Sequence, residues 1–213
     1  AWVDYRPSSV MFVDLEGSVP LLAELGPEAY NHALRAFHNL VTVHVRMYDG
    51  EVAQYLGDGV MCFFHRGRGE LGRAAAAIAA GWQIIAALQK PGEEQFNSVR
   101  IGIASGLALF NDEETAAGAR VVGTCINLAA RLQNEADPGT ILVCDESKRS
   151  AAGHFSFDAL PDRGLKGFPG KTTIWRVQAP KARRQQRPFD LPPPRAAPLP
   201  TAGRQAALQR LQR

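Results

Sequence analysis

Ser9-Val10-Met11-Phe12-Val13-Asp14-Leu15-Glu16-Gly17-Ser18 carries the strongest structural signal in this 213-residue chain. An apolar run that ends in a carboxylate predicts a buried strand over 9–14. The glycine-containing turn after it predicts a change from strand to helix, with backbone amides that can face a bound anion such as a triphosphate. We expect a short helix over 17–25 and a longer one that Pro27 opens and Asp49-Gly50 ends.

Two short strands, 51–56 and 60–65, flank Gly57-Asp58-Gly59, an Asp-Gly turn typical of a hairpin. Further along we expect an alanine-rich helix over 69–90, a strand over 99–108, a polar loop or ribbon over 111–119, a brief strand at 121–122, a helix over 125–135, a strand over 140–144 and a final hairpin of 154–160 and 172–177. This order predicts an α+β fold with a ferredoxin-like βαββαβ core and extra C-terminal strands.

The composition is that of an ordinary globular chain, with 46% hydrophobic and 21% charged residues. No apolar run is long enough to predict a transmembrane helix. Three scattered cysteines disfavour a disulfide framework or a zinc site and suit a reducing cytoplasm. The chain begins at Ala1 without a basic-then-apolar leader, so we expect a fragment with no export signal.

The net charge of +3 is unevenly distributed along the chain. From residue 178 onward there are eight basic residues and one acid, which leaves 16 basic and 20 acidic residues, or −4, in 1–177. The folded part is therefore not expected to bind nucleic acid. Seven prolines predict a Pro/Arg-rich linker over 178–203 after a domain of 1–177, and 204–213 predicts the start of a truncated downstream domain, with a frayed terminus as the alternative.

Asp14 and Asp58 are the two carboxylates that stand out by position. In a βαββ unit the first strand lies beside the hairpin, so the two side chains are expected to face each other. Two close anions repel unless a cation lies between them, and Mg²⁺ binds carboxylates together with water and phosphate oxygens. The alternative is structural: Asp14 caps the next helix and Asp58 is only a turn residue.

Asn127 and Arg131 form a second pair of candidate residues. They share one face of a helix because they are four residues apart. A guanidinium and an amide together suit negative charge that develops on phosphate oxygens. Arg100 lies in an apolar strand and Lys166 in a glycine-rich loop, and both are candidates to contact phosphates. A solvated helix face, an outward-pointing arginine and an ordinary loop are the corresponding structural alternatives.

Four motifs occur in register: Met11 to Ser18, Tyr55-Leu56-Gly57-Asp58-Gly59-Val60, Val99 to Gly106 and Val122 to Leu132. Together they resemble the class III nucleotidyl cyclase catalytic domain over about residues 7–177. The variety is similar to the bacterial cyclases related to soluble adenylyl cyclase, in several of which an ATPase domain follows the cyclase domain. Residues 197–211 resemble the junction to such a domain.

The resemblance implies a class III cyclase fold and a head-to-tail homodimer that converts ATP to 3′,5′-cyclic AMP and pyrophosphate. Asp14 and Asp58, with Leu15 beside them, would form the metal site for two Mg²⁺ or Mn²⁺ ions. Asn127 and Arg131 of the other chain would be catalytic, holding the ribose and stabilising the transition state. The residues implied for substrate binding are Gly17, Ser18, Gln54, Arg100, Arg120 and Lys166.

The sequence departs from the family at the positions that read the base. Adenylyl members usually carry a lysine where this chain has Gln54, and an aspartate or threonine where it has Arg120. Thr124 also replaces an acid often found before this helix. A glutamine amide can donate and accept, so it suits adenine or guanine. ATP is the substrate expected from family frequency and GTP stays open. A catalytically weak regulatory dimer is the second hypothesis, and the −4 charge argues against the third, a polymerase-like palm.

Overall fold

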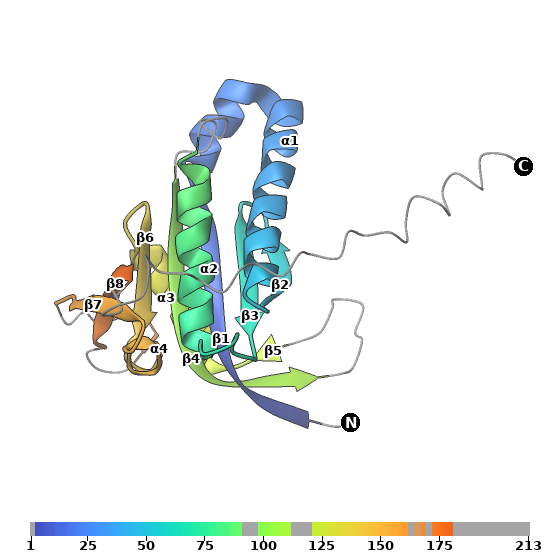
Figure 1. The fold of residues 1–213 in the computed structure, drawn as a ribbon. Helices are drawn as coiled ribbons and strands as arrows, with labels where there is room; N and C mark the ends of the chain where they lie inside the picture. Colours follow the sequence, from blue (N-terminus) through green and yellow to red (C-terminus); the bar gives the residue numbers. More distant parts are fainter. Residues whose placement is uncertain are drawn as a thin grey trace, which may run out of the picture.

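The computed structural model describes residues 3–90, 98–111, 121–161, 165, 167–168 and 172–180. In chain order the elements are β1 (Val3–Glu16), α1 (Ser18–Met47), β2 (Glu51–Leu56), β3 (Gly59–Phe64), α2 (Arg73–Leu88), β4 (Ser98–Asn111), β5 (Val121–Val122), α3 (Thr124–Glu135), β6 (Thr140–Cys144), α4 (Asp145–Ala151), β7 (Phe155–Ala159) and β8 (Ile174–Pro180) (Figure 1). None of these helices is both long and apolar enough to cross a membrane.

One mixed sheet has the strand order β2-β3-β1-β4-β6-β8-β7, and β5 pairs with β4. β1 is antiparallel to both of its neighbours, β3 and β4, whereas β4 and β6 are parallel. The order of the first four strands is that of a ferredoxin-like βαββαβ unit, and β6, β7 and β8 extend the sheet at the C-terminal side. The predicted α+β fold class is confirmed.

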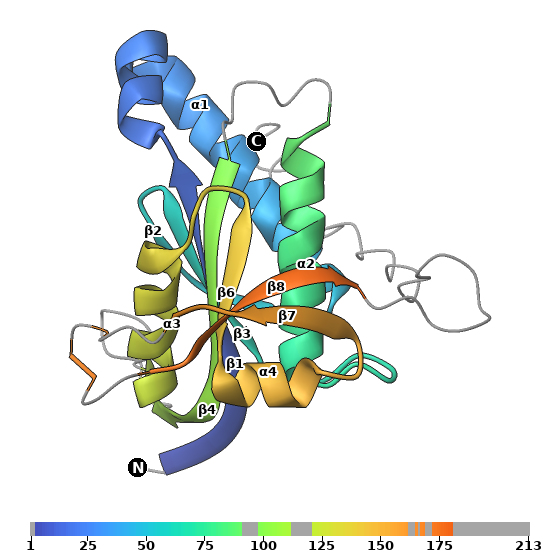
Figure 2. The ribbon, with the colours of Figure 1, turned by 90° about the vertical axis from the view of Figure 1, so that its left-hand side faces the viewer.

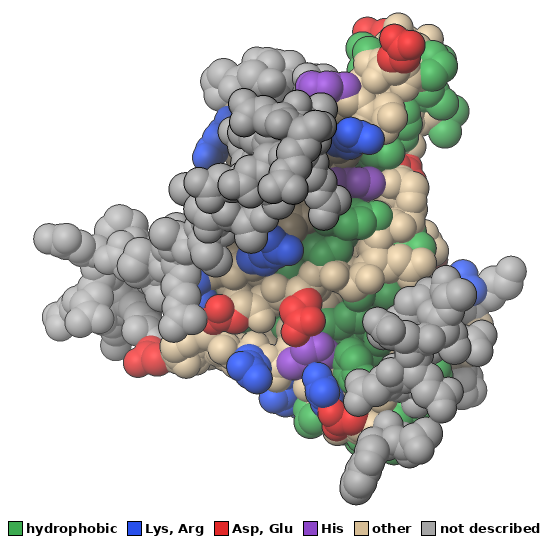
Figure 3. Space-filling model, turned by 90° about the vertical axis from the view of Figure 1, so that its right-hand side faces the viewer, with side chains coloured by type: hydrophobic (Ala, Val, Ile, Leu, Met, Phe, Trp, Pro, Cys, Tyr) green, Lys and Arg blue, Asp and Glu red, His purple; other side chains and the backbone are tan. Residues whose placement is uncertain are grey.

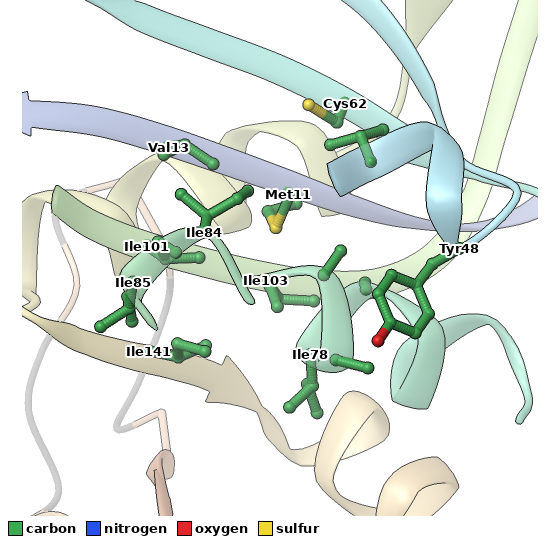
Figure 4. Packing of buried hydrophobic residues seen from close by; sticks show 14 of the residues in the cluster. Met11, Val13, Tyr48, Cys62, Ile78, Ile84, Ile85, Ile101, Ile103 and Ile141 are labelled. Carbon is green, nitrogen blue, oxygen red and sulfur yellow. The ribbon is translucent and has the colours of Figure 1, made fainter. Parts of the chain in front are cut away.

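The two faces of the sheet pack against different helices because side chains alternate along each strand. Met11, Val13 and Leu15 of β1 are buried against α1 and α2. Figure 4 shows Met11, Val13, Ile101 and Ile103 on the sheet, next to Ile78, Ile84 and Ile85 of α2. The opposite face packs against α3, which lies across the sheet from α2 (Figure 2). Asp14 lies between Val13 and Leu15 in β1 and therefore belongs to the α3 face.

The predicted break between two helices occurs inside α1. Gly26 has φ 76° and ψ 167°, a backbone conformation that favours glycine, and Pro27 begins the second helical segment. The first segment then runs away from the end of β1 and the second returns along the sheet (Figure 1).

Two element boundaries and one helix are the main differences from the predictions. β1 begins at Val3 instead of residue 9 because its polar first residues pair with the end of β4. β8 reaches Pro180, past the predicted domain end at 177. α4 was not predicted, because its sequence Asp-Glu-Ser-Lys-Arg-Ser-Ala buries only Ser147 and Ala151 and so has no apolar periodicity. Asn111, the first residue of the predicted loop over 111–119, is the last residue of β4. Residues 112–119, and the linker and downstream segment beyond Pro180, lie outside the described residues.

Candidate active site

Asp14 and Asp58 meet at the carboxyl end of β1. Asp14 pairs with Gly59, the residue that follows Asp58, in the antiparallel register of β1 and β3. The Leu15 backbone N–H also donates to the Asp58 carbonyl oxygen at 3.2 Å. This hydrogen bond fastens the hairpin turn to the end of β1. The structure therefore brings the two predicted carboxylates together, as the βαββ topology required.

The Asp14 carboxylate divides its two oxygens between neighbouring strands. Oδ2 lies 3.7 Å from Nη2 of Arg100 on β4, and Oδ1 faces Gly59 on β3, 3.4 Å from the position that a Cβ atom would take there. Burial raises the pKa of Asp14, the nearby Asp58 carboxylate raises it further, and the Arg100 guanidinium lowers it. The site thus holds a partly desolvated carboxyl beside a second acid, an arrangement that a cation would stabilise.

Ser18 and α1 hold the Asp58 turn from the other side. Ser18 Oγ donates to Asp58 Oδ2 at 2.5 Å. His38, also on α1, bonds through Nε2 to the carbonyl oxygen of Gly57 at 2.9 Å. Gly17 is the N-cap of α1 and supplies no side-chain cap, so no side chain at that position satisfies the first backbone N–H groups of the helix. Gly17 and Ser18 therefore lie where the sequence predicted a place for phosphate oxygens.

Arg100 is already engaged within the chain by Asp14 and by Glu16, a residue that was not singled out from the sequence. Arg100 Nε lies 2.9 Å from Glu16 Oε2. This contact is an ion pair without hydrogen-bond geometry, since neither atom makes a hydrogen bond to any described residue. The signal for Glu16 was its place two residues after Asp14, because alternate residues of a strand share a face. Two of its three guanidinium nitrogens, Nε and Nη2, therefore already lie near carboxylates.

Asn127 and Arg131 are both exposed on α3, as their four-residue spacing predicts. Leu132 on the other side of the helix is fully buried. α3 seats directly on the sheet at Gly102 of β4, where an added Cβ would come within 2.3 Å of the Ala129 carbonyl oxygen. The amide and the guanidinium therefore face away from the core and are open to another molecule.

Gln133 is the second residue that sequence reasoning missed. It follows Arg131 by two residues on α3, but its side chain is buried, and its amide lowers the pKa of Asp14. A single polar residue in an amphipathic helix gives no signal for such a contact, because the contact depends on how the helix sits on the sheet.

Gln54 lies on the exposed edge strand β2, on the same face of the sheet as Asp14. It is paired with Met61 of β3, which in turn pairs with Phe12 of β1, so the three side chains form a row beside the row of Asp14. Phe12 and Met61 are only partly buried. The row offers an apolar floor next to an amide. The other predicted base and phosphate contacts, Arg120 and Lys166, lie outside the described residues.

The described residues contain no larger metal-binding cluster, and a separate cavity lies away from the predicted site. No group of three or more His, Cys, Asp or Glu side chains in the described ranges is arranged to hold a metal ion, so Asp14 and Asp58 would need oxygens from the backbone or the substrate to complete a metal site. A cavity of about 390 Å³ opens near the start of β1 and is lined by residues such as Ser8, Arg73 and Ser105. None of the predicted site residues lines it.

Residues 3–179 match the family described as the adenylate and guanylate cyclase catalytic domain. An uncharacterised protein of Rhizobium meliloti (strain 1021) is 30% identical over 177 residues, which are 81% of this chain but only 17% of the length of that relative. The crystal structure of the adenylyl cyclase CyaB from P. aeruginosa superposes with a TM-score of 0.77 at 24% identity, over 87% of this chain and 100% of that one. The guanylate cyclase domain of RhGC from Catenaria anguillulae, in complex with GTP, gives 0.73 at 20% identity, over 85% and 100%.

Proposed function

Because this chain belongs to the adenylate and guanylate cyclase catalytic domain family, we propose that it converts ATP to 3′,5′-cyclic AMP and pyrophosphate at the interface of a homodimer. The observation that carries the proposal is the pair Asp14 and Asp58, which meet at the end of β1 beside the uncapped start of α1. Two adjacent acids in a partly desolvated position weaken the apo fold, which makes sense where a divalent cation binds.

The residues present fit such a cation. Asp14 Oδ1 and the Asp58 carboxylate face the same turn, and backbone oxygens near Leu15 and the substrate phosphates complete an oxygen-rich site of the kind Mg²⁺ and Mn²⁺ prefer. Bound there, a pair of Mg²⁺ or Mn²⁺ ions supplies a lowered pKa for the ribose 3′-hydroxyl and neutralising charge for the leaving phosphates.

The chain's own residues bind and orient the triphosphate. α1 begins at Ser18, and its N-cap Gly17 makes no side-chain hydrogen bond to the first N–H groups of the helix, which can therefore bind phosphate oxygens. Ser18 holds Asp58 in place, and Arg100 supplies positive charge on the far side of Asp14. We propose the same role for Lys166. The ribose 3′-oxygen then forms a bond to the α-phosphorus, the bond to the pyrophosphate oxygen breaks, and the hydroxyl proton passes to water.

A second copy of the chain completes the site. Asn127 and Arg131 are exposed on α3 and face solvent, so in a head-to-tail dimer they can hold the ribose and the developing charge in the opposite site. Figure 3, viewed from the side of α1 and β2, shows hydrophobic side chains among scattered charged groups. Several apolar side chains of these two elements are exposed: Val19, Leu22, Leu25, Val43, Tyr55 and Leu56. Such residues suit a protein interface.

The base is read by Gln54 over the floor of Phe12 and Met61. A glutamine amide can donate to and accept from either purine, so a guanylyl or dual-specificity cyclase is the alternative that this residue favours. We propose Arg120 as the second base contact. A weakly catalytic regulatory dimer is the other alternative, and it draws on the same two unusual positions.

We also propose a location in the cell for this domain and a place for it within a longer chain. Cys62, Cys125 and Cys144 are free and buried, which suits the cytoplasm. The chain spans 17% of the Rhizobium relative's length, and we propose that it works as the cyclase part of a longer chain, with a downstream domain after residue 203.

Product analysis with Mn²⁺ and ATP or GTP, side by side, tests the reaction. Asp14→Asn and Arg131→Ala should each reduce cyclic-nucleotide formation at least about a hundredfold. Random pairing of the two variants puts one intact site in each mixed dimer, so their mixture should recover about a quarter of the wild-type rate. No recovery would contradict a shared site. Retained nucleotide binding without any product would favour the regulatory dimer.

A further inference from the structure

Gln133 is a buried polar residue that the proposed reaction does not use. Only 7% of the surface of Gln133 is exposed, whereas Asn127 and Arg131 on the same helix belong to the exposed class. A glutamine is rarely buried in a helix face that otherwise packs Cys125, Ala129 and Leu132 against a sheet. The burial of this polar side chain therefore needs an explanation.

The position of Gln133 is set by a direct backbone contact. A Cβ atom added at Gly102 would lie 2.2 Å from the Gln133 backbone nitrogen and 2.3 Å from the Ala129 carbonyl oxygen. No side chain separates α3 from β4 at this point, so the helix cannot slide without disturbing the strand. Gly102 pairs with Phe12, one row along from the pair of Arg100 and Asp14. The Gln133 side chain thus starts one row from Asp14.

The amide end of Gln133 is buried close to the row of Asp14, on the face of the sheet that α3 covers. Its Nε2 makes no hydrogen bond to any residue of the described part. The other groups that face Asp14 are Asp58 from the hairpin turn, Arg100 from β4 and Glu16 from β1 itself. Among these, Gln133 is the only uncharged donor, and it approaches from the helix layer. A buried donor without a partner carries a desolvation cost, which a hydrogen bond to Asp14 would remove.

We propose that Gln133 is a positioning residue for the metal-binding carboxylate: its buried amide, unpartnered among the described residues, is available to donate to Asp14 from α3, while Arg100 contacts Oδ2 from β4 and Oδ1 faces the hairpin at Gly59. This inference rests on the proposed function, since it assigns Asp14 to a divalent cation. Its consequence is that one rigid helix serves two sites of the dimer. Asn127 and Arg131 serve the site of the second copy, and Gln133 orients the acid in its own.

Gln133→Met tests the proposal, because methionine keeps the length and apolar body of the side chain and removes the donor. Gln89→Met, at the exposed end of α2, is the matched control. The first measurement is Mn²⁺ binding to the 213-residue protein, by electron paramagnetic resonance, without nucleotide and with a non-reactive triphosphate analogue. Asp14→Asn identifies the relevant Mn²⁺ site. The second is the effect on kcat and KM, and the third is the melting temperature.

The proposal expects Gln133→Met to weaken Mn²⁺ binding about tenfold and to lower kcat by a similar factor, as loss of a partner to a metal ligand typically does. The nucleotide KM and the behaviour of Gln89→Met should stay unchanged. A lower melting temperature with unchanged Mn²⁺ affinity would mean that Gln133 only fills space, and would overturn the proposal. If Gln133→Met does not fold, Gln133→Leu is read by the same criteria.

The outcomes separate this inference from the proposed function. Wild-type protein that binds Mn²⁺ through Asp14 but makes no product from ATP or GTP would refute the reaction, and the Mn²⁺ titration of Gln133→Met would still decide the role of Gln133. Wild-type Mn²⁺ binding that is absent, or that survives Asp14→Asn, would overturn the inference, because there would be no metal-binding carboxylate to position.

Discussion

Gly102→Ala should damage stability and activity together, although it adds a single methyl group. The added Cβ would lie 2.2 Å from the Gln133 nitrogen, 2.3 Å from the Ala129 carbonyl oxygen and 2.8 Å from the Gln133 Cα. All three are backbone atoms of α3, so no rotamer change relieves the clash. Because ordinary van der Waals contact begins at 3.4 Å, the helix must retreat from β4 by about 1.2 Å.

The size of the effect follows from this displacement. Overpacking of a tight core costs about 1–3 kcal/mol, and we expect the upper end because backbone must move. For a domain of this size, a loss of about 3 kcal/mol lowers the melting temperature by about 6–12 °C. A shift of about 1 Å in a catalytic group reduces the rate about a hundredfold. Asn127 and Arg131 move with α3, so kcat should fall by that factor even below the new melting temperature.

Circular dichroism melting and cyclic-nucleotide formation at 20 °C measure the two effects. Gly153→Ala is the control, since a Cβ there meets nothing within 4 Å, and it should leave both quantities nearly unchanged. A Gly102→Ala protein that melts within 2 °C of the wild type and keeps its kcat would refute the claim that α3 packs on β4 with no room for an added methyl group.

Three further changes probe other parts of the site. Asp14→Asn should raise the melting temperature of the metal-free protein at pH 7.5 and abolish turnover, because burial and Asp58 disfavour the charged form of Asp14. A lower melting temperature would show that the contact between Asp14 and Arg100 outweighs both effects. Burial and nearby arginines lower the pKa of His65, so its contribution to stability is present above its unfolded pKa of about 6.5 and is lost as the pH falls below that value. Denaturation curves between pH 5 and 8 should therefore show a smaller loss of stability with falling pH for His65→Phe than for the wild type. Parallel pH dependences of the two proteins would contradict this prediction. Gln54→Lys should shift turnover toward ATP relative to GTP, measured as the ratio of kcat/KM values, and an unchanged ratio would exclude Gln54 from base reading.

The parts of the site that the sequence predicted are those governed by local rules. The apolar run before Asp14 and the Asp-Gly turn at Asp58 each define a strand end, and βαββ topology joins the two ends. The spacing of Asn127 and Arg131 likewise determines that they share a helix face. These rules also gave the α+β fold class, which the structure confirms.

The rest depended on how elements sit on each other. Gln133 is buried beside β4 because Gly102 lets α3 approach the strand closely, and a glycine in a strand sequence does not indicate which element packs on it. The position of Arg100 between Asp14 and Glu16 depends on the antiparallel register of β1 and β4, and its predicted contact with phosphates stays a prediction. α4 was not predicted because a seven-residue polar helix has no apolar periodicity in its sequence.

The direct seat of α3 on β4 also bears on how such a protein diverges. At Gly102 the contact is made with backbone atoms of α3, so a larger residue there would displace the helix that carries Asn127 and Arg131. The edge strand β2 has no comparable constraint, since its residues from Ala53 to Leu56 are exposed. Substitutions should therefore accumulate more readily on β2, at the margin of the sheet, than at the contact of α3 with β4.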